Sequence, residues 1–322
     1  MPSDGPILVT GAAGFIGSHL TAALLARGIT VVGLDNFDPY YDRSIKQRNA
    51  REAGLGSVAP LIEADITDDA ALRCVFDQYK PSGVIHLAGK AGVRPSISDP
   101  AGYMHTNVTG TARILAHAHR VASSRVVVAS SSSVYGNCKV SPFSEDLDVS
   151  TPISPYAASK RACELLAHAH VHLTKQPVAL LRFFTVFGPR QRPDLAISGF
   201  MQRISQGHPI AMFGDGTTAR DYTYVDDIVQ GILNAYDRAP AHGYRIWNLG
   251  NNKPVSLRDM IAAIEQVVGR AAQIDHKPMQ PGDVELTCAD ISRSTRELAY
   301  QPRTSFHEGL ARQWSWMRSL GN

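Results

Sequence analysis

The chain has 322 residues, of which 44% are hydrophobic and 19% are charged, and its formal net charge is +3. This length suits one large domain or two modest ones, and the composition is that of an ordinary globular protein. The charge forms neither a basic stripe nor an acidic tail, which argues against a nucleic-acid partner. No stretch reaches the roughly 20 apolar residues that span a bilayer, so we expect no membrane insertion.

Four cysteines lie far apart, without the paired spacing of a zinc site or a disulfide framework: Cys74, Cys138, Cys163 and Cys288. This pattern favours reduced thiols and a cytoplasmic protein. Histidine runs at 117–119 and 168–172 suggest a metal site only weakly, because residues two apart on a helix point to different sides. We therefore expect no metal.

The first apolar segment, residues 6–10, is typical of a strand, and a helical pattern follows at residues 18–27. Between them Gly11, Gly14 and Gly17 have the spacing Gly-x-x-Gly-x-x-Gly. Strand, glycine turn and helix form a dinucleotide fingerprint, in which backbone N–H groups at the helix N-terminus approach a pyrophosphate. The sequence therefore predicts a bound dinucleotide at this turn.

The next predicted strand, residues 30–34, ends in Asp35. An acidic side chain at this point of a dinucleotide fold accepts hydrogen bonds from the adenosine ribose. Its carboxylate would also repel the 2′-phosphate of NADP, so NAD is the expected cofactor.

Strand and helix patterns then alternate along the chain. The expected strands are residues 58–64, 83–88, 125–129 and 178–184, and the expected helices are residues 70–79, 102–119 and 156–173. Such alternation predicts an α/β fold, a doubly wound parallel sheet of the Rossmann type with helices on both faces. Ligands in this architecture lie beyond the carboxyl ends of the strands.

After Gly188-Pro189 the pattern is irregular and richer in proline and glycine. We expect an NAD-binding domain over residues 1–180 and a smaller C-terminal α/β substrate-binding domain over residues 181–322. A predicted helix at 222–238 and strand at 244–249 should return to the sheet, so that residues 221–250 or so rejoin the first domain.

Tyr156 and Lys160 stand four residues apart, directly after Pro155, a residue favoured at the first helical position. The spacing places a phenol and an ammonium on one face of the helix. A nearby cation lowers the pKa of a tyrosine from its usual value near ~10, so that the phenol can accept a proton near neutral pH. The pair is a candidate acid/base couple, although an exposed helical pair has the same spacing.

Taken together, these features resemble the extended short-chain dehydrogenase/reductases, and within them the nucleotide-sugar epimerases. The motifs that carry the resemblance occur in family order: Phe15 to Leu20, Leu87-Ala88-Gly89, the serines before Val134-Tyr135-Gly136, Tyr156-x-x-x-Lys160, Arg182 to Pro189, Arg220 to Asp227 and Gln280 to Val284. The resemblance covers nearly the whole chain.

The resemblance implies a role for many residues. It implies that the catalytic residues are Ser131, Tyr156 and Lys160. The NAD contacts that it implies are Gly11, Gly14, Phe15, Ile16, Gly17, Asp35, Asn36, Asp65, Ile66, Leu87, Ala88, Gly89, Asn107, Tyr156 and Lys160. The contacts to a UDP-sugar that it implies are Arg94, Ser131, Ser132, Ser133, Thr185, Arg192, Asp194, Phe213, Arg220, Gln280 and Asp283.

In this scheme Ser131 pairs with the sugar O4, Tyr156 is the acid/base, and Lys160 binds the nicotinamide ribose. Arg220 would bind the diphosphate, because a guanidinium suits phosphate oxygens. The alternative for Arg220 is a surface salt bridge with Asp221 or Asp226. The resemblance also implies a homodimer through a four-helix bundle formed by the two helices that carry the histidines.

Thr185 is the position most informative about the sugar. UDP-glucose 4-epimerases usually have Asn there, whereas the segment from Arg182 to Ala196 is similar to that of UDP-glucuronate 4-epimerases. The sequence departs from those enzymes at Arg190-Gln191, where they more often have Trp-Gly. Hydroxyls of Ser132, Ser133 and Thr185 could donate to a C6 carboxylate.

The expected reaction is therefore interconversion of UDP-glucuronate and UDP-galacturonate through a 4-keto intermediate, with transient hydride transfer to tightly bound NAD. A UDP-glucose 4-epimerase and, after it, a decarboxylase that forms UDP-xylose are the alternatives. Ser132-Ser133 stand where a 4,6-dehydratase would have Asp-Glu, which argues against that class. A non-catalytic NAD-binding module is a further alternative, but such proteins commonly lose the tyrosine or the lysine.

Overall fold

The computed structural model describes residues 5–278 and 284–320. Its main element is a seven-stranded sheet in the order β10-β6-β5-β4-β1-β2-β3, with every neighbouring pair parallel. The strands are β1 (Ile7–Thr10), β2 (Val31–Asp35), β3 (Leu61–Glu63), β4 (Gly83–His86), β5 (Val126–Ser131), β6 (Val178–Phe183) and β10 (Tyr244–Leu249). The α/β fold of Rossmann type expected from the sequence is confirmed.

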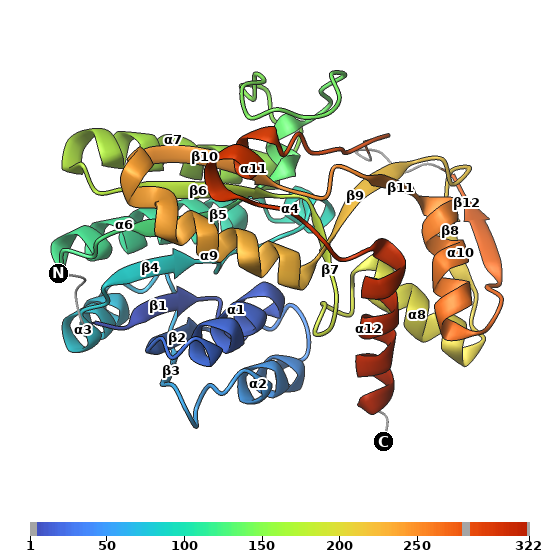
Figure 1. Cartoon of the computed structure of the whole chain (residues 1–322), viewed down its shortest axis with the longest axis horizontal. Helices are drawn as coiled ribbons and strands as arrows, with labels where there is room; N and C mark the ends of the chain where they lie inside the picture. The colour runs from blue at the N-terminus through green and yellow to red at the C-terminus, as the bar shows by residue number, and fades with distance from the viewer. Residues whose placement is uncertain (1–4, 279–283, 321–322) are drawn as a thin grey trace.

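Helices cover both faces of this sheet (Figure 1). Side chains alternate along β1, so that Val9 packs in the cluster under α1 (Phe15–Ala26) and α9 (Val225–His242). Leu8 faces the opposite cluster under α3 (Asp69–Tyr79), α6 (Gly110–Arg120) and α7 (Pro155–Thr174). The central strands are buried along their whole length because apolar helices close both sides.

The segment expected as one helix at 102–119 is instead three segments. They are α5 (Pro100–Tyr103), the π-helix η1 (Met104–Thr109) and α6. The Thr111 hydroxyl and the Cys163 thiol both donate to the carbonyl of Asn107, at 2.6 and 3.2 Å. These side-chain donors compete with the regular backbone ladder, which accounts for the wider turn at this point.

The C-terminal part has two small sheets beside the large one, on the right of Figure 1. Their strands are β7 (Thr185–Phe187), β9 (Ala219–Tyr224) and β11 (Pro254–Ser256) in one, and β8 (Ile210–Phe213) and β12 (Ile274–Lys277) in the other. The remaining helices are α2 (Arg43–Glu52), α4 (Val93–Ser98), the 3-10 helix η2 (Ser132–Tyr135), α8 (Ala196–Gln206), α10 (Leu257–Val268), α11 (Ser292–Leu298) and α12 (Phe306–Ser319).

Two predicted boundaries were wrong in an instructive way. The helix expected from residue 222 begins at Val225, because Tyr222 and Tyr224 extend β9 and pack their rings around Phe187 of the paired strand β7. The strand expected from residue 58 begins at Leu61, because backbone hydrogen bonds fold residues 54–59 into a turn. In both places pairing and turn contacts override the local pattern.

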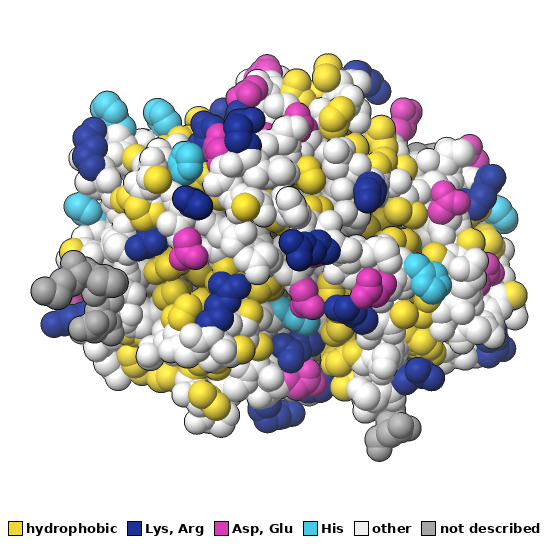
Figure 2. All heavy atoms as spheres, viewed as in Figure 1, with side chains coloured by type: hydrophobic (Ala, Val, Ile, Leu, Met, Phe, Trp, Pro, Cys, Tyr) yellow, Lys and Arg dark blue, Asp and Glu magenta, His cyan; other side chains and the backbone are white. Residues whose placement is uncertain are grey.

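Figure 2 shows basic and acidic side chains interspersed over one face of the molecule. Histidines gather at its upper left, over the ends of α6 and α7. No helix in the described part of the chain is long and apolar enough to cross a membrane.

Candidate active site

The carboxyl ends of β1, β2 and β4 meet around the glycine turn. Gly11 has a φ of +69°, and a Cβ there would lie 2.8 Å from the backbone nitrogen of Ala88. A Cβ on Gly17 would collide with the carbonyl oxygen of Gly11. Neither position accepts a side chain, so the first turn of α1, with Phe15 and Ile16, packs directly on the strand and leaves its N–H groups facing the turn.

Asp35 closes β2 and organises this turn. Its carboxylate accepts hydrogen bonds from the backbone N–H of Ala13 at 3.0 Å and of Phe37 at 2.8 Å. Burial raises the pKa of Asp35 from its usual value, against these hydrogen bonds. Two carboxylate oxygens offer about four acceptor positions, which leaves capacity for a ribose hydroxyl. The bond to Ala13 was not expected from the sequence.

Asn36 and Asp65 lie side by side past the ends of β2 and β3. The Asn36 amide donates to the Asp65 carboxylate at 2.7 Å, and Thr67 donates to the other oxygen through its backbone N–H and its hydroxyl at 2.7 and 2.6 Å. Burial opposes the charge on Asp65, but these donors together hold its pKa below the usual value. Ile66, which is buried, packs on Gly110 at the start of α6.

Asn107, Gly89 and Lys160 surround one point beyond β4, two residues past Leu87. A Cβ on Gly89 would lie 2.8 Å from the Asn107 side-chain oxygen and 3.4 Å from the Lys160 ammonium nitrogen. Lys160 donates to the carbonyl of Ala129 at 2.9 Å. The Asn107 amide nitrogen donates to the Lys90 carbonyl at 3.0 Å and its oxygen accepts from the Lys90 N–H at 2.8 Å. These polar groups form a small surface at this point, which we call the polar floor.

His86 supports this floor from below and was missed in the sequence. Its ring bonds to the Thr10 hydroxyl at 2.7 Å and to the Thr111 hydroxyl at 3.2 Å. Because Thr111 uses its proton on the Asn107 carbonyl, His86 must donate to Thr111 from Nε2 and accept from Thr10 at Nδ1. Burial, and then the charge of Lys160, lower the pKa of His86 to about 3. A neutral, oriented imidazole thus joins β1, β4 and α6.

The catalytic candidates lie at the end of β5 and the start of α7. The Ser131 hydroxyl accepts from the Ser133 N–H at 3.1 Å and donates to the Ser133 hydroxyl at 3.2 Å. Helix α7 begins at Pro155, as expected, with the Ser154 hydroxyl accepting from the Ala157 N–H. Tyr156 is half-buried in the first turn of this helix, and Lys160 lies buried one turn later.

Two aromatic rings meet beside the candidate centre. The ring of Tyr103, from α5, packs edge-on against that of Tyr156 with 6.1 Å between centroids. The Tyr103 hydroxyl donates to the carbonyl of Ala91, which ties α5 to the loop after β4. This packing restricts the orientation of the Tyr156 phenol.

A buried polar network lies behind Ser131 and was also missed. Arg182, 1% exposed, donates two hydrogen bonds of 2.8 Å to Glu164, 0% exposed, and a third of 3.0 Å to the Tyr135 hydroxyl. Ser130 donates to Glu164 at 2.7 Å. Burial opposes the charge on Glu164, but Arg182 and Ser130 outweigh it and lower its pKa. Helix α7 is therefore tied to β5 and β6 directly behind the candidate site.

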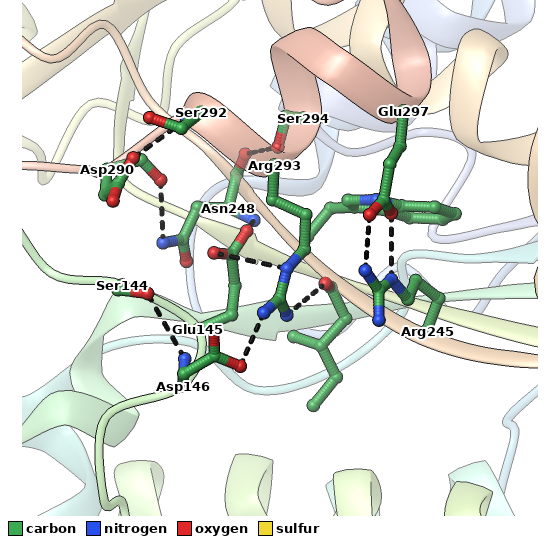
Figure 3. Close-up of polar contacts among 12 residues, drawn as sticks. Ser144, Glu145, Asp146, Arg245, Asn248, Asp290, Ser292, Arg293, Ser294 and Glu297 are labelled. Carbon is green, nitrogen blue, oxygen red and sulfur yellow. Dashed lines mark hydrogen bonds and ion pairs between the residues drawn. The ribbon is translucent and has the colours of Figure 1, made fainter.

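Asn248 of β10 extends the network to the C-terminal part. It accepts from the Tyr135 hydroxyl at 2.7 Å, and its amide donates to the carbonyl of Asp290 at 3.1 Å. Figure 3 shows Asn248 between Glu145 and Asp290, with Arg293 reaching Glu145 and Asp146. The end of β10 is thereby joined to the segment that precedes α11.

The remaining predicted sugar and nucleotide contacts lie in the C-terminal part, except Arg94, which lies in α4. Thr185 is half-buried at the start of β7. Arg192 and Asp194 form a two-bond ion pair at 3.0 and 2.6 Å. The Arg94 guanidinium lies 5.5 Å from the centre of the Phe213 ring. Gln280 and Asp283 lie outside the described residues.

Arg220 lies in β9 beside Asp221, one of the two ion-pair partners considered for it. It donates to the carbonyl of Ala219 at 3.0 Å. Asp221 is buried and accepts from the backbone N–H groups of Asn251, Asn252 and Ala289 at 2.7 to 2.9 Å. The Asp221 carboxylate is therefore held by backbone donors and stabilises the turn after β10.

Residues 7–250 match the NAD dependent epimerase/dehydratase family. The chain belongs to this family. A UDP-glucuronate 4-epimerase of Thermodesulfobacterium geofontis is 40% identical over 315 residues, covering 98% of this chain and 96% of that protein.

Solved structures of this family have the same fold. The UDP-glucuronic acid 4-epimerase of Bacillus cereus, in complex with UDP-glucuronic acid and NAD, has a TM-score of 0.91 at 35% identity, covering 98% of this chain and 99% of that one. The UDP-glucose 4-epimerase of Thermotoga maritima, with UDP-glucose, has a TM-score of 0.90 at 28% identity, covering 98% and 100%.

NAD is the cofactor of this epimerase/dehydratase family, and the residues present fit it. The glycine turn has no side chain at Gly11, Gly14 or Gly17 to stand between a pyrophosphate and the first turn of α1, and Asp35 is the acceptor expected for a ribose. Gly89 lies close to the Asn107 oxygen and the Lys160 ammonium, which gives polar groups for the nicotinamide end. Most of the predicted NAD contacts thus lie at the carboxyl edge of the sheet or in the first turns that follow it, and Asn107 joins them from η1.

Several histidines of α6 and α7 have individual partners. His117 bonds to Asp69 at 3.0 Å, and His170 bonds to Gln176 at 2.8 Å. His119 and His170 meet edge to face with 5.9 Å between ring centroids. Within residues 5–278 and 284–320, no three His, Cys, Asp or Glu side chains are grouped as metal ligands.

Proposed function

We propose that this protein is a UDP-glucuronate 4-epimerase, which interconverts UDP-glucuronate and UDP-galacturonate. It is an NAD-dependent UDP-sugar 4-epimerase, and the proposal concerns which sugar it takes. The observation that carries it is the group of hydroxyls of Ser131 to Ser133, at the end of β5 and in η2, with Thr185 at the start of β7, two residues past the β6 residue that pairs with Ser131. Hydroxyls are suitable donors to a C6 carboxylate.

The register of the sheet supports this grouping. Ser131 pairs with Phe183 of β6, and Thr185 follows two residues later at the start of β7. Ser132, Ser133 and Thr185 are all half-buried, so their hydroxyls have a partly desolvated setting in which charge-assisted hydrogen bonds are strong.

The reaction chemistry assigns one task to each catalytic residue. Ser131 holds the sugar O4 by a hydrogen bond, and the Tyr156 oxygen takes the O4 proton. Bound NAD would supply the acceptor for the C4 hydride and the donor for its return. Lys160 binds the nicotinamide ribose beside Tyr156, and Tyr156 gives the proton back to O4 once the 4-keto sugar has turned over. A positioned acid/base of this kind contributes roughly 10²- to 10⁴-fold to a rate.

A uronate brings a hazard that the hydroxyls address. The 4-keto intermediate is a β-keto acid, and it loses carbon dioxide when the C5–carboxylate bond aligns with the carbonyl π system. Donors from Ser132, Ser133 and Thr185 would hold the carboxylate away from that alignment. We therefore propose epimerisation without net decarboxylation.

The nucleotide contacts remain part of the proposal. Arg220 would bind the diphosphate, Asp194 and Phe213 would lie near the uracil, and Gln280 and Asp283 would contact the uridine ribose. Arg94 and Arg192 would be further contacts to the UDP-sugar. Residues 1–180, rejoined by residues 221–250 or so, would hold NAD, and residues 181–322 would hold the nucleotide sugar.

A UDP-glucose 4-epimerase is the second candidate, favoured by the similarity in fold to the Thermotoga maritima enzyme. One experiment distinguishes the two functions. Purified protein, without added NAD, is incubated with UDP-glucuronate and separately with UDP-glucose, and the products are resolved by chromatography and mass.

UDP-galacturonate of unchanged mass supports the proposal and a retained cofactor. UDP-galactose as the sole product means that the enzyme acts on neutral hexoses. A UDP-pentose as the main product identifies a decarboxylase.

We further propose a cytoplasmic homodimer in which α6 and α7 of two copies form a four-helix bundle. Leu165 and Leu173 of α7 are 56% and 79% exposed, which is unusual for large apolar side chains on a helix whose other face is in the core. Association through this face would cover both.

A further inference from the structure

The turn between Thr185 and Arg192 departs from the resemblance at Arg190-Gln191, and the proposed function does not account for it. Its backbone is unusual at two positions, with φ of +143° at Gly188 and +63° at Arg190. A non-glycine residue with positive φ is held there only by its surroundings. The contacts that hold this turn come from both of its sides.

Gln191 anchors the inner side. It is 5% exposed, and its amide nitrogen donates to the carbonyl of Val186 at 3.0 Å. Its amide oxygen accepts from the Ser198 hydroxyl at 2.9 Å and from the Gln313 amide at 2.8 Å. Gln191 thus bonds to the residue next to Thr185 while being itself the residue next to Arg192.

Gln313, from α12, completes the inner side. It is 0% exposed, its nitrogen also donates to the Ser198 hydroxyl at 3.0 Å, and its oxygen accepts from the Gly188 N–H at 2.9 Å. The two amides and one hydroxyl therefore satisfy one another and two backbone groups of the turn. Buried networks with every member paired define a single geometry.

The outer side is held by the NAD-binding half. His19 of α1, directly after the glycine turn, donates to the carbonyl of Pro189 at 2.8 Å, and burial lowers its pKa to about 4, so that it is neutral. Arg190 donates to Glu52 of α2 at 2.9 Å. The turn is thus fixed between α1 and α2 on one side and α8 and α12 on the other.

We propose that Gln191 and Gln313 are positioning residues that set the places of Thr185 and Arg192 toward the UDP-sugar. Gln191 bonds to the residue after Thr185 and directly precedes Arg192, and Gln313 holds Gly188 and Gln191, so a loosened turn shifts both side chains. The proposal rests on the proposed function, since it takes Thr185 and Arg192 as substrate contacts. Neither glutamine touches the substrate in this scheme.

The test compares Gln191→Met, Gln313→Met and the double variant, because methionine keeps the volume and removes the amide. Ser198→Ala is a milder break in the same network. The matched control is Gln176→Met, which removes a glutamine that is 7% exposed and bonded to Ser123 and His170 at the opposite, amino-terminal edge of β6. Folded fraction, kcat, KM and the UDP-pentose share of the product are measured for each.

The expected result is a rise in KM of about tenfold in either single methionine variant, since a displaced Thr185 or Arg192 would lose about one hydrogen bond to the substrate, which is worth roughly one decade in binding. Ser198→Ala should shift KM in the same direction by less. The KM of the double variant should be less than about tenfold above that of either single variant, because the two amides share one hydrogen bond. On UDP-glucuronate the UDP-pentose share should also rise.

The proposal is overturned if the variants lose stability as Gln176→Met does while KM and product ratio stay at the unaltered values. KM is measured on whichever UDP-sugar the unaltered enzyme converts. If that sugar is UDP-glucose alone, the proposed uronate function fails, and the KM comparison still decides the role of the two glutamines.

Discussion

At the residue scale, the proposed reaction depends on the Tyr156 oxygen. The phenol is half-buried and packs on Tyr103, so removing its oxygen leaves the ring contacts in place. We expect Tyr156→Phe to reduce turnover by at least about 100-fold, the usual size of an acid/base contribution. The rate of conversion of the UDP-sugar checks this, with circular dichroism and bound NAD as controls for folding. Turnover equal to that of the unaltered enzyme would instead favour a binding protein.

His86 determines part of the pH dependence of stability. Its pKa is about 3 in the folded protein against 6.5 for a free side chain, so the unfolded chain binds a proton that the folded chain does not between these values. Stability is therefore lost as the pH falls from 6.5 toward 3, and by pH 5 the loss reaches about 2 kcal/mol. His19, with a pKa of about 4, acts in the same direction.

The variant His86→Gln removes this titration and keeps a polar side chain between Thr10 and Thr111. Its free energy of unfolding in urea should depend less steeply on pH between about 4.5 and 6.5. The difference in slope should correspond to at most about one bound proton. His208→Gln, at an exposed position, is the control and should keep the original slope. Equal slopes for His86→Gln and the unaltered protein would contradict the assignment.

At the element scale, the glycine turn depends on the close packing of α1 on β1. A methyl group on Gly17 would collide with a backbone carbonyl, which cannot move without opening the turn. We expect Gly17→Ala to lose NAD during purification and to be destabilised by roughly 1–3 kcal/mol, as overpacked sites are. NAD released by denaturation is the measurement. Gly199→Ala in α8 is the control, because its methyl would meet only an atom at 3.7 Å.

The ion pair between α7 and β6 gives a second prediction at this scale. Arg182→Met leaves the Glu164 charge buried with weaker partners, which costs about 3–5 kcal/mol in comparable sites. Arg182→Met combined with Glu164→Leu removes both charges and should be less destabilising than Arg182→Met alone. Denaturant unfolding of the three proteins checks this. A double variant that is less stable than Arg182→Met alone would mean that the two side chains do not act as a pair.

At the scale of the whole molecule, the site lies where the large sheet meets the C-terminal part. The Asn248 network and the turn at 188–192 both cross this junction. The carboxyl edge of the sheet is therefore held in place by α7, β10, α11 and α12. The reaction centre is therefore assembled from segments far apart in the chain, and its precision depends on how the two parts pack.

The proposed homodimer is also a property of the whole molecule. Leu165→Glu would place a charge on the expected face of α7 without disturbing the core, because the side chain is 56% exposed. We expect light scattering to give a dimer for the unaltered protein and a monomer for the variant. Lys139→Glu, at an exposed position outside α6 and α7, is the control. A monomer in both proteins, or an unchanged dimer in Leu165→Glu, would rule out this interface.

Much of the site was predictable because its signals are local. The glycine spacing, Asp35 at a strand end, and Tyr156 one turn before Lys160 each depend on a few consecutive residues with fixed geometry. Parallel strands bring their carboxyl ends to one edge, so the order of elements was enough to gather these residues. The family, the fold and the NAD cofactor followed from them.

Only the tertiary structure decided the contacts between distant residues. The tautomer of His86 depends on Thr10 and Thr111, the π-helix at Asn107 on donors from the next turn and from Cys163, and the extension of β9 through Tyr224 on pairing with β7. Local pattern carries no information about such partners, because they become neighbours only when helices and strands pack. Sequence alone thus determined which chemistry-bearing residues reach the edge of the sheet, and packing decided how each is held there.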